Sequence, residues 1–187
     1  MPVKTQKEKS FRIPLVEYVG KEAWSLETGQ KALEKIEKVL RSHPERIVDL
    51  DLRGIQRMDS SCSREAIANL LRRHRGERCF FLSGDPDKST TENIDVAFAR
   101  QEMTVLLRRA NGFVPLGHPL RPHLLQTLVV IEELGSATVR QVCVAIKDLT
   151  VPACNNRLKD LCDSGLVLRV DGVAPSGGKE FLYLAVC

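Results

Sequence analysis

The sequence predicts two consecutive units, an α/β unit with a mixed sheet and helices and a smaller α+β unit. Three observations lead to this prediction. Segments with the two-residue period of strands alternate with amphipathic helical segments over residues 11–117. Two prolines and a glycine then interrupt the pattern, and we assign a stiff linker to residues 118–122. Short helical segments and two alternating strands follow over residues 123–187.

Composition places the chain among ordinary soluble proteins. It has 187 residues, of which 43% are hydrophobic and 28% charged, and a net charge of +4. No apolar run approaches the roughly 20 residues of a membrane span. Residues 1–10 are polar and lysine-rich, which predicts a disordered arm rather than a secretory signal. We therefore expect a cytoplasmic protein without membrane contact.

The first unit is expected to begin with an edge strand at residues 11–16, because Pro14 interrupts pairing on one side. An amphipathic helix follows at 28–42, where apolar residues recur on one face until His43-Pro44 stops it. The segment RIVDLDL, residues 46–52, is typical of a strand.

The rest of the first unit continues this alternation. A second helix is expected at 60–74, where four apolar residues share one face, and the fully apolar CFFL at 79–82 predicts a buried strand. A loop rich in Gly, Pro and Asp precedes a third helix at 91–109. A short strand at 112–116 completes a mixed sheet with helices against it.

The second unit has three helices and a hairpin. Pro122 suits the first turn of a helix that ends near Gly135, and Ser136-Ala137-Thr138 caps a short second helix. Thr150 caps a third, which Gly165 terminates. The strands LVLRV and FLYLAV follow, joined by DGVAPSGGKE. This order is that of a helix-turn-helix with a wing.

The segment TVPACNNRLKDLCDSGLVLR resembles the winged-helix domains of bacterial transcription regulators, over residues 120–187. With the apolar positions of the third helix turned inward, Asn156 and Lys159 lie on its outer face. Asn suits adenine, and Arg or Lys suits guanine or phosphate. The residues expected to bind double-stranded DNA are Thr150, Pro152, Asn155, Asn156, Arg157, Lys159 and, in the wing, Lys179.

Charge leaves a second interpretation open. Residues 1–118 hold 21 Lys/Arg and 17 Asp/Glu, and residues 119–187 hold 7 of each, so the whole excess of +4 lies in the first part. DNA affinity depends on neutralising phosphates, and winged helices also serve as protein-docking modules. A dimer or the basic run RRHRGER at 72–78 supplies the missing charge if DNA is bound. The alternative for that run is a solvated helix end.

The segment VDLDLRGIQRMDSSCSREAI resembles the STAS domain, the fold of anti-sigma-factor antagonists, in which a strand and a turn lead to DSSG at a helix start. Together with the order of elements, the resemblance covers about residues 8–118. It implies a partner surface at Asp59, Ser60, Ser61 and Cys62, with Ser60 phosphorylated by a kinase-type partner. Cys62 departs from the family, which usually has Gly there. The alternatives are capping alone, with Glu65 near capping-box position, or a redox role for Cys62.

Enzymatic motifs are missing from the sequence. None of the four histidines is placed to activate Ser60, and there is no phosphate-binding or dinucleotide-binding glycine loop. The six cysteines lack zinc spacing, so we expect no metal and no cofactor. The sequence therefore predicts a homodimeric, STAS-like transcription regulator that is not an enzyme. The alternative is an adaptor whose two domains are both protein-docking surfaces.

Overall fold

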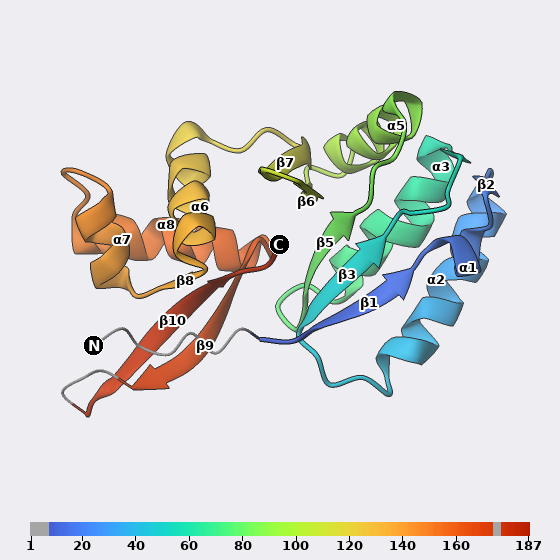
Figure 1. Cartoon of the computed structure of the whole chain (residues 1–187). Coiled ribbons are helices and arrows are strands. Elements are labelled where there is room, and N and C mark those ends of the chain that lie inside the picture. Colours follow the sequence, from blue (N-terminus) through green and yellow to red (C-terminus); the bar gives the residue numbers. More distant parts are fainter. Residues whose placement is uncertain (1–7, 174–176) are drawn as a thin grey trace.

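The computed structural model describes residues 8–173 and 177–187 of the chain. A five-stranded mixed sheet has the order β1-β3-β5-β6-β7, in which only β7 runs antiparallel to its neighbour (Figure 1). Its strands are β1 (Ser10–Pro14), β3 (Ile47–Asp51), β5 (Cys79–Ser83), β6 (Thr104–Arg109) and β7 (Gly112–Gly117). Pro14 lies on an edge strand, as predicted, because β1 ends the sheet.

Helices cover one face of this sheet (Figure 1). They are α2 (Leu26–Leu40), a continuous helical stretch of α3 (Ser60–Ser63), η1 (Arg64–Ala68) and α4 (Asn69–Arg73), and α5 (Lys88–Ala99). Val48 and Leu50 of β3 are buried against them, together with Ile36 and Leu40 of α2. The short α1 (Val16–Val19), β2 (Glu22–Ala23) and β4 (Arg57–Met58) lie in the connecting segments. We call residues 8–117 the N-terminal half.

The C-terminal half, residues 122–187, combines helices with a small antiparallel sheet of order β8-β10-β9. Thr138 begins α7 with a capping box, in which its hydroxyl accepts from the N–H of Gln141 and the Gln141 side chain accepts from the N–H of Thr138. The elements are α6 (Pro122–Leu134), β8 (Ser136–Ala137), α7 (Val139–Ala145), α8 (Val151–Asp163), β9 (Val167–Val173) and β10 (Lys179–Ala185).

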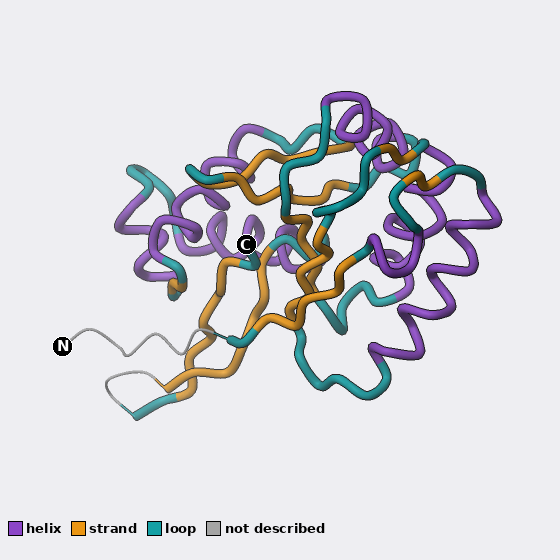
Figure 2. Tube along the Cα trace, turned by 45° about the vertical axis from the view of Figure 1, so that its right-hand side comes forward, coloured by secondary structure: helices purple, strands orange, loops and turns teal. Residues whose placement is uncertain are grey.

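The two halves share one apolar core on the second face of the sheet (Figures 1 and 2). Ile47, Phe81 and Leu106 project from that face and are buried in the same cluster as Leu128 and Leu161 of the C-terminal half. Neighbouring residues of a strand point to opposite faces, so a strand buried on both faces is apolar at every position. Burial on both faces therefore explains why the CFFL segment of β5 is apolar at every position.

One predicted helix is wrong. The expected helix at 91–109 ends at Ala99, and Thr104–Arg109 forms β6 within the sheet. Glu102 adopts a left-handed backbone with φ 54°, which interrupts the helix. The run TVLLRR that follows has residues buried on both faces, which suits a central strand.

Smaller differences lie at the ends of elements. The helix expected at 60–74 contains the π-helical segment η1. Ser10, placed in the arm by the sequence, is the first residue of β1. The rest of the arm up to residue 7, and Ser176 at the tip of the expected wing, lie outside the described residues. Within the described ranges no helix has the length and apolar character needed to cross a membrane.

Candidate nucleic-acid interface

Helix α8 is held by its apolar side. Cys154, Leu158 and Leu161 are buried, and the hydroxyl of Thr150 caps the helix by accepting from the N–H of Ala153 at 3.4 Å. Pro152 lies in the first turn, where its missing N–H costs no helical hydrogen bond. Because the buried residues recur at helical spacing, the opposite side of α8 is left for solvent or a partner.

Three polar residues occupy that opposite side. Asn155, Asn156 and Lys159 are exposed, as the periodicity predicts for Asn156 and Lys159. The ammonium of Lys159 lies 2.5 Å from a carboxylate oxygen of Asp163, so part of its charge is balanced within the helix. The side-chain amides of Asn155 and Asn156 make no hydrogen bond within the described part of the chain, which leaves them available to a ligand.

Arg157 does not point outward, contrary to the expectation from the sequence. Its side chain is half-buried, and Nη1 lies 3.4 Å from both the carbonyl of His123 and Oε1 of Gln126, on α6. Position 157 lies between the buried and exposed sides of α8, so either direction is compatible with helical periodicity. Packing against α6 decides which one is adopted.

The exposed side of α8 borders a groove that residues of both halves line. The groove encloses about 560 Å³. Its cations, Arg46, Arg78, Lys159 and Arg169, outnumber its acids, Glu77 and Asp163. Two of the four cations come from the N-terminal half. This half therefore adds positive charge to the groove beside the C-terminal half, which has no net positive charge. This juxtaposition was not visible in the sequence, although the basic run at 72–78 pointed to a source of charge.

Hydrogen bonds fix the groove's two walls together. Arg75 Nε donates to the carbonyl of Asp163 at 2.5 Å, and Arg46 Nη1 donates to the carbonyl of Arg169 at 3.4 Å. Arg78 instead donates to the carbonyls of Leu40, His43 and Glu45, all within its own half. Arg78 therefore contributes positive potential to the groove while its donors remain occupied.

The β9–β10 hairpin forms another side of the groove. Phe181 is exposed, and the guanidinium carbon of Arg169 lies 4.6 Å from its ring centroid. Lys179 is exposed at the start of β10, and its side chain makes neither an ion pair nor a hydrogen bond among the described residues. The adjacent residues 174–176 of the connecting segment are not described.

The second candidate surface lies at the start of α3, where Asp59 is the cap. Its Oδ1 accepts from the N–H of Cys62 at 2.6 Å, and its Oδ2 accepts from the N–H of Ser25 at 3.0 Å. Ser60 and Ser61 are half-buried. Glu65 takes no part in a capping box; its carboxylate contacts Arg64 and Asn69. The helix end is therefore complete without either serine hydroxyl.

Cys62 is placed differently from the expectation that it belongs to a partner surface. It is fully buried, and burial, with a smaller effect of Asp59, raises the pKa of its thiol to about 12. A Cβ added to Gly29 of α2 would lie 2.9 Å from the carbonyl oxygen of Cys62, so the two helices are in close contact there. Desolvation outweighs the helix N-terminus, and the thiol is not poised for redox chemistry.

An exposed aromatic residue beside this helix start was missed by the sequence analysis. Trp24 is 47% exposed and Leu26 is 41% exposed, on either side of Ser25, whose N–H binds Asp59. Ser25 has φ 79° and ψ 153°, a conformation rarely adopted by residues other than glycine. The only available signal was the lone Trp in a polar segment, KEAWSLETG.

Asp49 and Asp51 are two carboxylates on one strand, and both bind side chains of the same half of the chain. Asp49 accepts from Ser83 Oγ at 2.5 Å and pairs with Arg12 Nε at 2.9 Å. Hydrogen bonding to the Arg53 side chain lowers the pKa of Asp51. No group of three or more His, Cys, Asp or Glu side chains suited to a metal ion occurs in residues 8–173 and 177–187. The six cysteines, all within those ranges, are free.

Comparison with known protein families, with curated proteins and with solved structures finds no significant match for the chain.

Proposed function

We propose that the chain is a transcriptional regulator in which the C-terminal half is a winged helix that binds double-stranded DNA through α8 and the β9–β10 hairpin. One observation carries the proposal: Asn155, Asn156 and Lys159 share the exposed side of α8 and border a groove in which cations predominate. Unpaired amides offer base contacts, and cations on both sides of the groove offer phosphate contacts. Homodimer formation would double both sets, as for other helix-turn-helix proteins.

A salt series tests this proposal. The affinity for DNA is expected to fall steeply with salt. The double variant Lys159→Ala with Lys179→Ala should make the negative slope of log K against log salt shallower by about 2, one for each lost phosphate contact. Lys35→Ala on α2, an exposed lysine away from the groove, is the matched control and should keep the wild-type slope. Equal slopes for the double variant and the control would remove α8 and the hairpin from the interface.

Base contacts require a separate measurement. Asn156→Ala is expected to reduce discrimination between a selected operator and its mismatched versions by about 1–3 kcal/mol. Its effect on non-specific DNA affinity should be small, because no charge is lost. Selection of bound sequences from a random duplex pool supplies the operator. A variant that loses affinity equally for all sequences would assign Asn156 to backbone positioning.

The N-terminal half is proposed to be a STAS-like domain that receives a signal from a protein partner at the start of α3. Ser60 and Ser61 lie half-buried beside the exposed Trp24 and Leu26, which offer apolar area to a partner. Phosphorylation of Ser60 would place negative charge at a helix N-terminus and alter that surface. Ser60→Glu is expected to change operator affinity or oligomeric state, measured by fluorescence anisotropy and by sedimentation. Wild-type values for both would end the switch hypothesis.

A non-DNA-binding adaptor is the second candidate. Two observations favour it: Asp163 balances the charge of Lys159, and the N-terminal half stands beside the exposed side of α8. If the chain is an adaptor, duplex DNA will bind weakly and without sequence preference, while Trp24→Ala will abolish capture of a protein partner. The salt series therefore separates the two candidates.

A further inference from the structure

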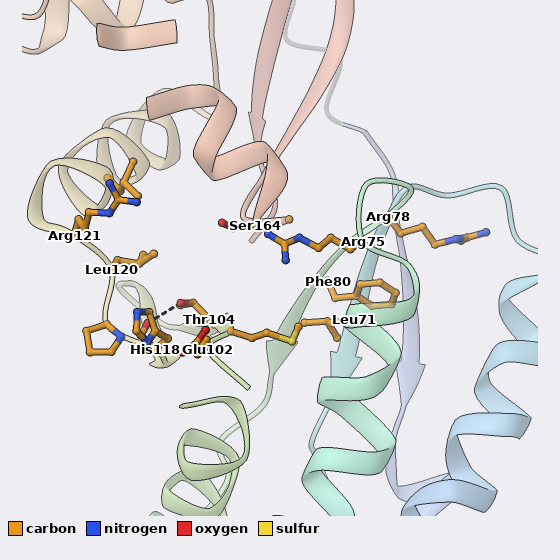
Figure 3. Close-up of a pocket in the computed structure, with 14 residues that line it drawn as sticks. Leu71, Arg75, Arg78, Phe80, Glu102, Thr104, His118, Leu120, Arg121 and Ser164 are labelled. Atoms are coloured by element: carbon orange, nitrogen blue, oxygen red, sulfur yellow. Dashed lines mark hydrogen bonds between the residues drawn. The ribbon is translucent and has the colours of Figure 1, made fainter. Parts of the chain in front are cut away.

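A cavity of about 180 Å³ lies where the two halves meet, beside the segment that joins them (Figure 3). One wall comes from Leu71 of α4 and Phe80 of β5, and the opposite wall comes from Leu120 and Leu124 around the start of α6. Met103 also lines the cavity. These five side chains form the apolar part of the lining, to which Thr104, His118 and Ser164 add polar groups.

Charged groups gather at the rim of this cavity. Figure 3 shows Arg75 directed into the space between the halves, Arg121 at the opposite rim and Arg78 turned away. Both Arg75 and Arg121 are exposed, so their guanidinium groups lie at the mouth rather than inside. Glu102 is the one acid among the described residues that line the cavity. A partly apolar lining with a cationic mouth suits a ligand that has an apolar body and an anionic end.

Most donors at the mouth are unused. Arg75 Nε donates a hydrogen bond to the carbonyl of Asp163, and within the described residues the two terminal nitrogens of Arg75 make no hydrogen bond. Arg121 makes neither a side-chain hydrogen bond nor an ion pair in the described part of the chain, and its side chain does not cap α6. Guanidinium groups match the planar geometry of a carboxylate.

We propose that this cavity binds a small organic carboxylate whose apolar body is the size of one aromatic ring. The volume sets the size, because a cavity of about 150 Å³ accommodates benzene. The ring would lie between Phe80 and Leu120, with the carboxylate at the mouth between Arg75 and Arg121. Because the ligand would contact both halves, its binding stabilises their docked arrangement. Ligand binding at this site does not require DNA binding, so the two proposals are tested independently.

Calorimetric titration of the full-length chain tests the site, with benzoate as the probe. Saturable binding is expected with a Kd of about 1 mM or tighter. Benzamide keeps the ring and removes the charge, and acetate keeps the charge and removes the ring. Each should bind at least about tenfold more weakly than benzoate. Absence of saturable benzoate binding, or equal binding of benzamide, would overturn the proposal.

Variants locate the binding site. Arg121→Gln should weaken benzoate at least about tenfold, and Glu102→Gln should strengthen it, because each changes the charge at the mouth. Leu120→Trp should fill the cavity and abolish binding. Arg140→Gln, on the exposed surface of α7 outside the cavity, is the matched control. Wild-type affinity in both Arg121→Gln and Leu120→Trp, with the thermal unfolding temperature unchanged, would place any benzoate elsewhere and refute the site.

Discussion

The starts of α3 and α8 carry the same local signal and lie in different surroundings. Each has an oxygen-bearing cap, Asp59 or Thr150, that accepts from the N–H three residues later. At α3 the cap distance is 2.6 Å, the second carboxylate oxygen binds Ser25, and Cys62 is buried beneath α2. At α8 the distance is 3.4 Å and Val151 is 54% exposed. A capping sequence therefore fixes where a helix begins but not what surrounds it.

Burial at the start of α3 should have its largest effect on thiol reactivity. Because burial raises the pKa of Cys62 to about 12 from 9.0, its alkylation by iodoacetamide near about pH 8 should be roughly a thousandfold slower than that of an ordinary thiol. Mass spectrometry of the labelled native protein measures this, with urea-unfolded protein as control. The half-buried Cys143 serves as an internal reference. If Cys62 reacts as fast as Cys143, the Cys62 thiol is accessible to solvent and is not buried at the start of α3.

Close packing at α3 predicts a stability effect. Gly29→Ala would bring a Cβ to 2.6 Å from Cβ of Glu65, so α2 must shift and the free energy of unfolding should fall by about 1–3 kcal/mol. Gly178→Ala is the matched control, since nothing lies within 4 Å of its added Cβ. Urea unfolding measures both. Equal stabilities would mean that α2 and α3 separate at little cost.

The two caps can be compared directly. Asp59→Ala should cost about 1–2 kcal/mol of stability, because two hydrogen bonds are lost and one of them is partly buried. Thr150→Ala should cost about 0.5 kcal/mol, because its single bond is long and exposed. Asp59→Asn, which retains an acceptor, should recover most of the loss. A larger loss of stability for Thr150→Ala than for Asp59→Ala in urea unfolding would show that burial does not decide how much each cap contributes.

The smallest effects are expected from the side chains proposed to contact partners. Ser60→Ala and Asn156→Ala remove groups that make no side-chain hydrogen bond in the described residues, so each should change stability by no more than about 0.5 kcal/mol. Functional loss in either variant would then be separable from unfolding. A larger drop in the thermal unfolding temperature for Ser60→Ala would assign Ser60 to the fold.

Local patterns predicted most elements because they depend on residues close in sequence. The apolar spacing of 28–42 and the capping sequences before α7 and α8 led to helices that the structure confirms. The pattern failed at 91–109, where a left-handed Glu102 separates a helix from a central strand. A strand buried on both faces and a buried helix have similar composition, so periodicity did not distinguish them there.

The candidate sites were predictable only in part. Periodicity placed Asn156 and Lys159 outward, but it left open the directions of Asn155 and Arg157, which flank that face. The position of Trp24 beside Asp59 depends on the pairing of β2 with β4, whose paired residues are 35 positions apart in the sequence. Exposed aromatic residues have no periodic signal, so no pattern in the sequence indicates this surface.

The sequence by itself determined most element types and the caps of α7 and α8, because these follow from hydrogen bonding and apolar spacing within a few residues. Only the tertiary structure decided that the C-terminal half packs on the free face of the sheet and that α8 borders a groove with Arg46 and Arg78. Apolar residues at Ile47, Phe81 and Leu106 require burial, but the hydrophobic effect is non-directional and does not specify the partner. That choice rests on the complementary shapes and hydrogen bonds of surfaces built from residues far apart in the sequence.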